Sequence, residues 1–214
     1  MSESVGEGPA GTAVDSLRCG PQGVSRAEAE AVSTELLWDQ GTRLAHVMAA
    51  GRLARKLAVL FEQPEADLLV AAATLHDIGY SPRIAGVGFH PLDGARYLRA
   101  QGFPDRLACL VAHHSLAIMS SDRIAVQALR EQFPREESML ADALVFADMH
   151  SSPDGQIIPV GQRLDDICER HPGPRTEPRV RLLGEAITRV TRALLEVGSG
   201  SDSSYADEIL AIDR

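Results

Sequence analysis

Four polar residues stand at or beside positions that helical periodicity would turn toward an apolar core. At 3.6 residues per turn, His46 shares a helix face with three apolar residues of its own run, Ala50, Leu53 and Leu57. His76 lies on the apolar face of the next run and is followed at once by Asp77. Asp148 closes a third apolar run, ALVFADM. An inward carboxylate is costly unless it is paired or binds a metal, so the pattern predicts a metal site.

Further histidines lie between these positions. His90 opens the run HPLDGARYL, and His113 and His114 end another helical run. Because adjacent side chains on a helix diverge by about 100°, only one residue of that pair is expected to be a ligand. Imidazole and carboxylate donors suit zinc, iron or manganese better than a calcium cage. The predicted cofactor is therefore a divalent transition metal, as one or two ions.

Each of these residues, taken alone, also has a purely structural explanation. A single inward histidine such as His46 is more often a hydrogen-bonded core residue, and Asp148 could cap a neighbouring helix. His90 could simply begin its own helix, and Asp93 could either orient a histidine or solvate that helix. We favour the metal site because so many potential ligands occur together in the same stretch of chain.

The rest of the sequence predicts helices to carry these residues. A capping box at Ser25 and Glu28 starts the first helix, and eight further helical patterns cover residues 42–61, 65–76, 91–101, 104–115, 122–132, 136–149, 160–170 and 178–196. Neither an alternating strand pattern nor an internal repeat is visible, so the predicted fold class is all-α, a single-domain helical bundle.

The composition predicts flexible ends around one helical domain. Residues 1–24 are rich in small and polar residues and are expected to form a flexible tail. The helical domain is predicted at residues 25–197, with its core at 41–150. Residues 198–214 are predicted to be a linker and a C-terminal tail, in which YADEILAIDR could be either a short docking helix or disordered.

Charge and cysteine usage limit the partners. The chain has 214 residues and a formal net charge of −9, which argues against duplex nucleic acid or an anionic membrane as the main partner. The three cysteines are far apart and predict no disulfide framework. Neither a membrane span nor a signal peptide is recognisable, so we expect a soluble, cytoplasmic protein. The oligomeric state is not indicated.

The order of these residues resembles the HD superfamily of metal-dependent phosphohydrolases, which is named for its His-Asp doublet. The resemblance covers roughly residues 40 to 150 and rests on His46, on the doublet in ATLHDIGY, and on the aspartate of ALVFADMH. It implies an HD-type helical bundle in which His46, His76, Asp77 and Asp148 hold metal. In dinuclear members two more histidines hold a second ion, a placement that His90 and His114 match; His114 is preferred to His113 because Ser115 follows it.

The same resemblance implies hydrolysis of a small phosphate ester, such as a nucleotide or sugar phosphate, by metal-activated water. Asp77 would bridge the ions, and the candidate phosphate-binding cations are Arg43, Arg83 and Arg96. The sequence lacks the acidic pair of the guanosine-tetraphosphate hydrolases, the Gly-Tyr-Pro motif of the cyclic-dinucleotide phosphodiesterases and the glutamate of the deoxynucleotidases. These three activities are therefore disfavoured.

Two other functions use the same ligands. Some HD proteins hold two irons and carry out oxygen-dependent cleavage of C–P or C–C bonds, typically with an additional acid before the first histidine. Asp39 is the candidate for that acid in this sequence, although it could equally end a helix. The second alternative is a sensor that keeps the metal or ligand without turnover.

Overall fold

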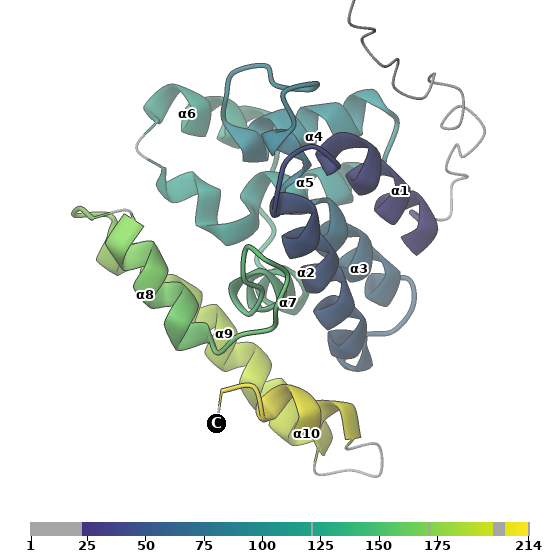
Figure 1. The fold of residues 1–214 in the computed structure, drawn as a ribbon, viewed down its shortest axis with the longest axis vertical. Helices are drawn as coiled ribbons and strands as arrows, with labels where there is room; N and C mark the ends of the chain where they lie inside the picture. The colour runs from purple at the N-terminus through teal and green to yellow at the C-terminus, as the bar shows by residue number, and fades with distance from the viewer. Residues whose placement is uncertain (1–22, 121, 171, 199–203, 214) are drawn as a thin grey trace, which may run out of the picture.

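The computed structural model describes residues 23–120, 122–170, 172–198 and 204–213 (Figure 1). These residues form helices and one isolated β-bridge between Ser151 and Ile157, which confirms the all-α prediction. Across these residues, we find no helix with the length and apolar character that crossing a membrane requires. The elements are α1 Arg26–Leu37, α2 Arg43–Leu57, η1 Ala58–Leu60, α3 Glu65–Leu75, η2 Ile78–Tyr80, α4 His90–Ala100, α5 Asp105–His113, η3 His114–Met119, α6 Arg123–Gln132, α7 Met139–Met149, α8 Val160–Arg170, α9 Thr176–Gly198 and α10 Ser204–Leu210.

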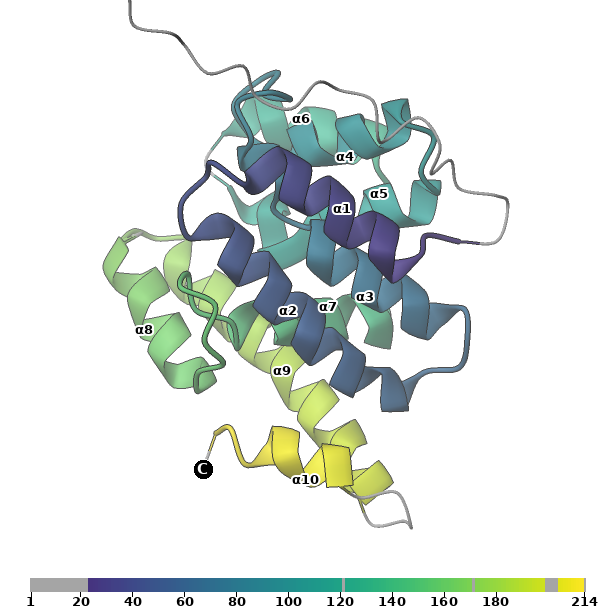
Figure 2. The same cartoon turned by 45° about the vertical axis from the view of Figure 1, so that its right-hand side comes forward.

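Two helices, α3 and α7, form the centre of the bundle. Both are apolar on nearly every face, and such helices are stable only when other helices surround them. The neighbours of α3 are α1, α2, α5 and α7, while α9 packs along α7. In both views α7 lies below α4, α5 and α6 and above α10, with α8 to its left (Figures 1 and 2).

The contact between α2 and α3 depends on one glycine. A Cβ atom added at Gly51 would lie 2.5 Å from Oγ1 of Thr74, so only glycine permits the two helices to approach this closely. Thr74 is itself buried and donates its hydroxyl to the carbonyl of Val70. Because His46 lies on α2 and His76 directly follows α3, this close packing brings the two histidines to the same end of the bundle.

Three helices begin at side-chain caps. Ser25 accepts the backbone N–H of Glu28 at 3.2 Å, as the capping-box prediction required. Asp122 caps α6 through the N–H of Ala125, and Ser138 caps α7. Since the first N–H groups of a helix have no partner within it, these caps determine where the helices begin.

The helix predicted at residues 104–115 ends earlier than the periodicity indicated. The α-helix stops at His113, and Ser115 and Leu116 adopt left-handed backbone angles, with φ of 50° and 55°. Such angles are uncommon for residues other than glycine and are found more often at functional sites than elsewhere. The break turns His114 away from the direction that a continuous helix would have given it.

Residues 204–213, which lie within the predicted linker and C-terminal tail at 198–214, pack against the helical domain. These residues include α10, which packs on α2 and α9 and buries Ala206 and Ile209. Asp213 accepts the N–H of Val160 at 2.8 Å and lies 3.0 Å from Nε2 of the buried His150. Of the two possibilities for YADEILAIDR, the structure therefore shows the docking helix.

At the other end of the chain, the predicted flexible tail of residues 1–24 falls almost wholly outside the described residues. Within the part that is described, Val24 is buried in the core. The packed domain therefore begins before Ser25, the residue at which the sequence placed its start.

Candidate metal centre

The first group of donor atoms comes from three helices. Nε2 of His46, on α2, lies 3.2 Å from Nε2 of His76 and 3.1 Å from Oδ1 of Asp148. The same oxygen of Asp148, near the end of α7, lies 3.7 Å from Nε2 of His76. All three side chains are buried. Two imidazole nitrogens and one carboxylate oxygen therefore face the same small volume.

Asp77 lies between this group and a second one, and each of its oxygens faces one group. Oδ2 is 3.5 Å from Nε2 of His76 and 3.7 Å from Nε2 of His46. Oδ1 is 3.4 Å from Nε2 of His90 and 3.2 Å from Nε2 of His114. A carboxylate placed in this way can bridge two adjacent cation positions.

The second group combines the first residue of α4 with the first residue of η3. Nε2 of His90 lies 3.3 Å from Nε2 of His114, and the ring of His90 stacks on Tyr80 with the centroids 3.9 Å apart. The backbone of α4 reaches this position because it lies directly against Gly79, two residues after Asp77. The glycine that follows the His-Asp doublet thus determines how close His90 comes to the carboxylate.

Backbone carbonyls orient three of the imidazole rings. Nδ1 of His76 donates to the backbone carbonyl of Ala73 at 2.8 Å, and Nδ1 of His114 donates to the backbone carbonyl of Val111 at 2.6 Å. Nδ1 of His46 lies 3.3 Å from the carbonyl of Ser152. Because a carbonyl oxygen can only accept, these contacts place a proton on Nδ1 and leave Nε2 as the ring nitrogen that faces the cluster.

Burial and neighbouring charges shift the pKa values of the donor side chains in different directions. Burial lowers the pKa of His76 to about 4 and that of His90 to about 3, so both rings are neutral at pH 7. Burial alone would raise the pKa of Asp148, but its hydrogen bond with His46 and its electrostatic interactions with His76 and His46 hold that pKa well below its usual range. The pKa of His114 is raised, because its hydrogen bond to Asp77 and the charge of that carboxylate outweigh burial.

The donor set fits one or two divalent transition-metal ions. Two sets of three donor atoms each lie within 4.8 Å of one another: His46, His76 and Asp77 in one, and Asp77, His90 and His114 in the other. Asp77 and Asp148 are buried, and buried carboxylates are costly unless cations or hydrogen-bond donors lie beside them. Nitrogen and oxygen donors of this kind suit zinc, iron or manganese.

Comparison with known proteins decides the family. The sequence model of the HD domain matches residues 43–174, which is more than half of the chain and contains all six donor residues. The chain belongs to the HD-domain family. No curated protein and no solved structure matched the chain. Membership indicates a metal-dependent hydrolase, and the buried His and Asp side chains of this HD domain could hold the metal.

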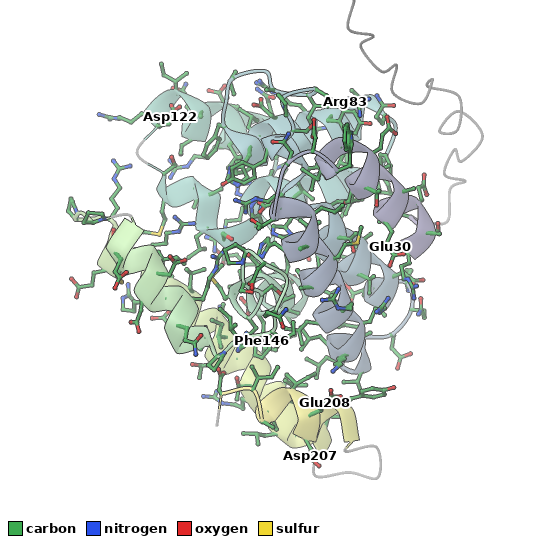
Figure 3. All side chains as sticks on the ribbon, in the orientation of Figure 1. Glu30, Arg83, Asp122, Phe146, Asp207 and Glu208 are labelled. Carbon is green, nitrogen blue, oxygen red and sulfur yellow. The ribbon has the colours of Figure 1, made fainter. Side chains whose placement is uncertain are left out.

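Of the predicted arginines, only Arg43 reaches the centre of the HD domain. Its Nη1 lies 2.6 Å from Oδ2 of Asp77, and its guanidinium lies over the ring of Tyr80 at 4.1 Å. Arg83 instead donates to the backbone carbonyl of Glu35 at 2.8 Å and pairs with its carboxylate, near α1 (Figure 3). The structure therefore does not bring Arg83 to the cluster, because α1 supplies the partner for its charge.

Several other candidates also lie elsewhere. His113 contacts the backbone carbonyl of Phe133 through Nε2 at 2.8 Å, whereas its neighbour His114 enters the cluster. Asp93 accepts the N–H groups of Val87 and Gly88, so it holds the loop before α4 and does not orient a histidine. Asp39 is exposed and bonded to Gln40. Arg96 donates to Gln132.

Sequence reasoning missed three residues beside the centre. Ser115 donates its hydroxyl to Oδ2 of Asp148, and Arg179 donates to the carbonyl of Ser115 at 2.8 and 3.0 Å. Arg163, on α8, is buried, and its Nη2 lies 3.9 Å from Oδ1 of Asp148. None of the three stands out in the helical pattern. Only the His-Ser pair at 114–115 hinted at a role for Ser115.

A pocket of about 760 Å³ opens beside the second group of donors. Its walls include the side chains of Tyr80, His90, His114, Ser115, Arg175 and Arg179. This volume is within the range of sites that bind small molecules. The HD domain thus places a cationic and aromatic pocket next to its buried donor atoms.

Proposed function

We propose that this HD-domain protein hydrolyses a small phosphate ester, such as a nucleotide or sugar phosphate, at a dinuclear metal centre. The observation that carries the proposal is the position of Asp77, whose two oxygens each face a separate set of donors. Six protein donors exceed what a single ion usually takes from side chains, and a shared carboxylate is a common way to hold two ions close together.

The metals would supply an activated water and would bind the phosphoryl oxygens. The remaining tasks fall to the side chains around them. The backbone bonds of His76 and His114 keep Nε2 directed at the centre, and Ser115 holds the carboxylate of Asp148. Because these supports are already in place, little reorganisation is needed when metal and substrate bind.

We assign the phosphate contact outside the metals to Arg43. Its guanidinium lies at the edge of the cluster and keeps part of its surface exposed, with 29% side-chain exposure. The guanidinium group packs on the ring of Tyr80 in a cation–π contact. Replacing Arg43 with Gln should raise the KM about ten-fold or more, because a hydrogen bond to a charged group contributes about 1.5–3 kcal/mol. Arg83→Gln is the matched control and should leave the KM unchanged.

Nothing in the structure favours the oxygenase alternative. The acid that this activity would require before the first histidine is Asp39, which is exposed and bonded to Gln40 outside the cluster. A sensor without turnover would use the same donors and is distinguished only by the absence of product. Both alternatives are therefore outcomes of the experiment below.

The experiment measures phosphate release by protein loaded separately with manganese, zinc and iron, from p-nitrophenyl phosphate, nucleoside monophosphates and sugar phosphates. We expect release from at least one substrate class, at equal rates in air and under strict anaerobiosis. Product formation that requires both oxygen and iron would replace the proposal with the oxygenase. Bound metal without turnover on any phosphate ester would replace it with the sensor.

A pair of variants links the activity to the cluster. Asp77→Asn removes the bridging charge with almost no change in volume, and should abolish both metal content and turnover while the helical circular dichroism is kept. Asp105→Asn is the control, since that carboxylate is 76% exposed and pairs only with Arg99. Full activity in Asp77→Asn would refute the assignment.

A further inference from the structure

A second hollow, of about 590 Å³, lies against one face of α6. Arg123, Val126, Gln127 and Arg130 line it, and their spacing of three, four and seven residues places them on the same side of the helix. Arg175, next to the start of α9, lines the hollow as well. Three arginines therefore line one hollow at the edge of the molecule, near the start of α6 that Asp122 marks in Figure 3.

This hollow adjoins the pocket beside the metal centre. Met119, Ser120 and Arg175 line both of them. Arg175 is held at the junction by a hydrogen bond from its Nη1 to the backbone carbonyl of Ser120. A molecule that reaches the donor cluster through the pocket can therefore extend across Arg175 toward α6.

The charge of the hollow is opposite to that of the whole chain. The chain has a formal net charge of −9, yet in the described part of the chain no carboxylate side chain lines this hollow. Among the residues that the structure describes, Arg123 and Arg130 have no ion-pair partner, whereas other exposed arginines such as Arg106 and Arg189 are paired with carboxylates. Two acids close in sequence have other hydrogen-bond partners. Asp122 caps α6, and the carboxylate of Glu131 accepts a hydrogen bond from the side-chain amide of Gln127 at 2.8 Å.

Stability of the helix does not explain the position of Arg123. It is the first residue of α6, where the helix dipole is positive and a cation is unfavourable. Arg130, in the last turn, is favourably placed for the dipole. Arg123 is thus an unpaired cation at the positive end of a helix dipole. A bound anion would offset this unfavourable position, because it would supply the missing opposite charge.

From these contacts we infer that the hollow binds a second phosphate group of the substrate, so that the substrate is a small molecule with two separate phosphates. This inference rests on the proposed function, because the first phosphate would be the one at the metal centre. Arg123 and Arg130 would hold the remote phosphate, and Arg175 would lie between the two. A single phosphate monoester would leave this cationic hollow without a ligand.

The test compares ligands that differ only in the second phosphate. Hexyl phosphate is titrated into the metal-loaded protein by calorimetry, beside the bisphosphates of butane-1,4-diol, hexane-1,6-diol and octane-1,8-diol, at 0.15 M salt. We expect at least one bisphosphate to bind about ten-fold or more tightly than hexyl phosphate, since two charge-assisted contacts are added. Arg123→Gln and Arg130→Gln should each reduce that advantage and leave the affinity for hexyl phosphate unchanged. Arg192→Gln, an exposed arginine of α9 that lines neither hollow, is the control.

The outcomes separate this inference from the proposed function. If hexyl phosphate binds at the metal centre but no bisphosphate binds more tightly, the inference is wrong and the proposed function stands. If neither kind of ligand binds the metal-loaded protein, both fail. If the advantage persists in Arg123→Gln and Arg130→Gln, the second phosphate lies elsewhere and the inference is wrong. Arginine-dependent binding of a single-stranded oligonucleotide without any gain from the bisphosphates would also overturn it, in favour of a nucleic-acid surface.

Discussion

Replacing Gly79 with Ala should remove His90 from the cluster while leaving the first group of donors in place. A Cβ atom at this position would lie 1.9 Å from the backbone oxygen of His90 and 2.7 Å from the backbone nitrogen of Gly94. Real Cβ contacts do not fall below 3.0 Å, so the backbone of α4 must move away by about 1.1 Å. Metal–ligand distances tolerate only about ±0.2 Å. His90 would therefore no longer reach an ion shared with Asp77 and His114.

The expected cost to the fold is about 1–3 kcal/mol, the usual range for overpacking in a well-packed interior. The assay combines thermal unfolding of chelator-treated protein with metal content after reloading. We expect Gly79→Ala to hold about one ion fewer per chain than the unmodified protein. Gly184→Ala is the matched control, since nothing lies within 4 Å of a Cβ there and α9 should gain slightly in stability. Unchanged metal content in Gly79→Ala would refute the reasoning, because it would mean that His90 is not a ligand.

Two further predictions concern single side chains. His114→Ala should lose one metal position and keep the other. His113→Ala should keep both, because the ring of His113 contacts the carbonyl of Phe133 and not the cluster. Elemental analysis of the two variants checks this, and equal metal losses would contradict it. Ile209→Ala should lower the free energy of unfolding by about 2–4 kcal/mol, because Ile209 is 1% exposed where α10 joins the core. Ile124→Ala, at a residue that is 83% exposed, should change the free energy of unfolding by less than about 0.5 kcal/mol. Both variants are measured by denaturant titration. An equally small effect of Ile209→Ala would show that α10 does not pack on the core.

Sequence periodicity was informative about the donors because burial and helix phase are linked. His46 shares its helix face with apolar residues, whereas His76 and Asp148 stand at the ends of helices that are apolar on nearly every face. All three were therefore expected to be buried, and the structure brings them together. The placement of His114 depended instead on the resemblance to HD proteins. Periodicity alone could not choose between His113 and His114, because the non-helical backbone angles at His113 and His114, where α5 ends, have no signature in the sequence.

The arginines and the C-terminus were harder to place for another reason. The partner of a long charged side chain depends on which residues the tertiary structure places nearby. Arg83 donates to the backbone carbonyl of Glu35 on α1, whereas Arg43 pairs with Asp77. The segment that carries Ile209 is too short to predict a stable helix by itself, and its apolar residues are buried because α2 and α9 provide the complementary surface. Contacts between residues distant in the sequence decided both cases.

The most direct test of the account is the metal content of protein purified without chelator and then equilibrated with manganese, zinc or iron. Elemental analysis should find about two ions per chain, because Asp77 presents one oxygen to each set of donors. Asp77→Ala should lose both ions and His114→Ala only one. A content that never exceeds one ion per chain would contradict the dinuclear centre, and protein that stays free of metal under these conditions would contradict the metal site itself.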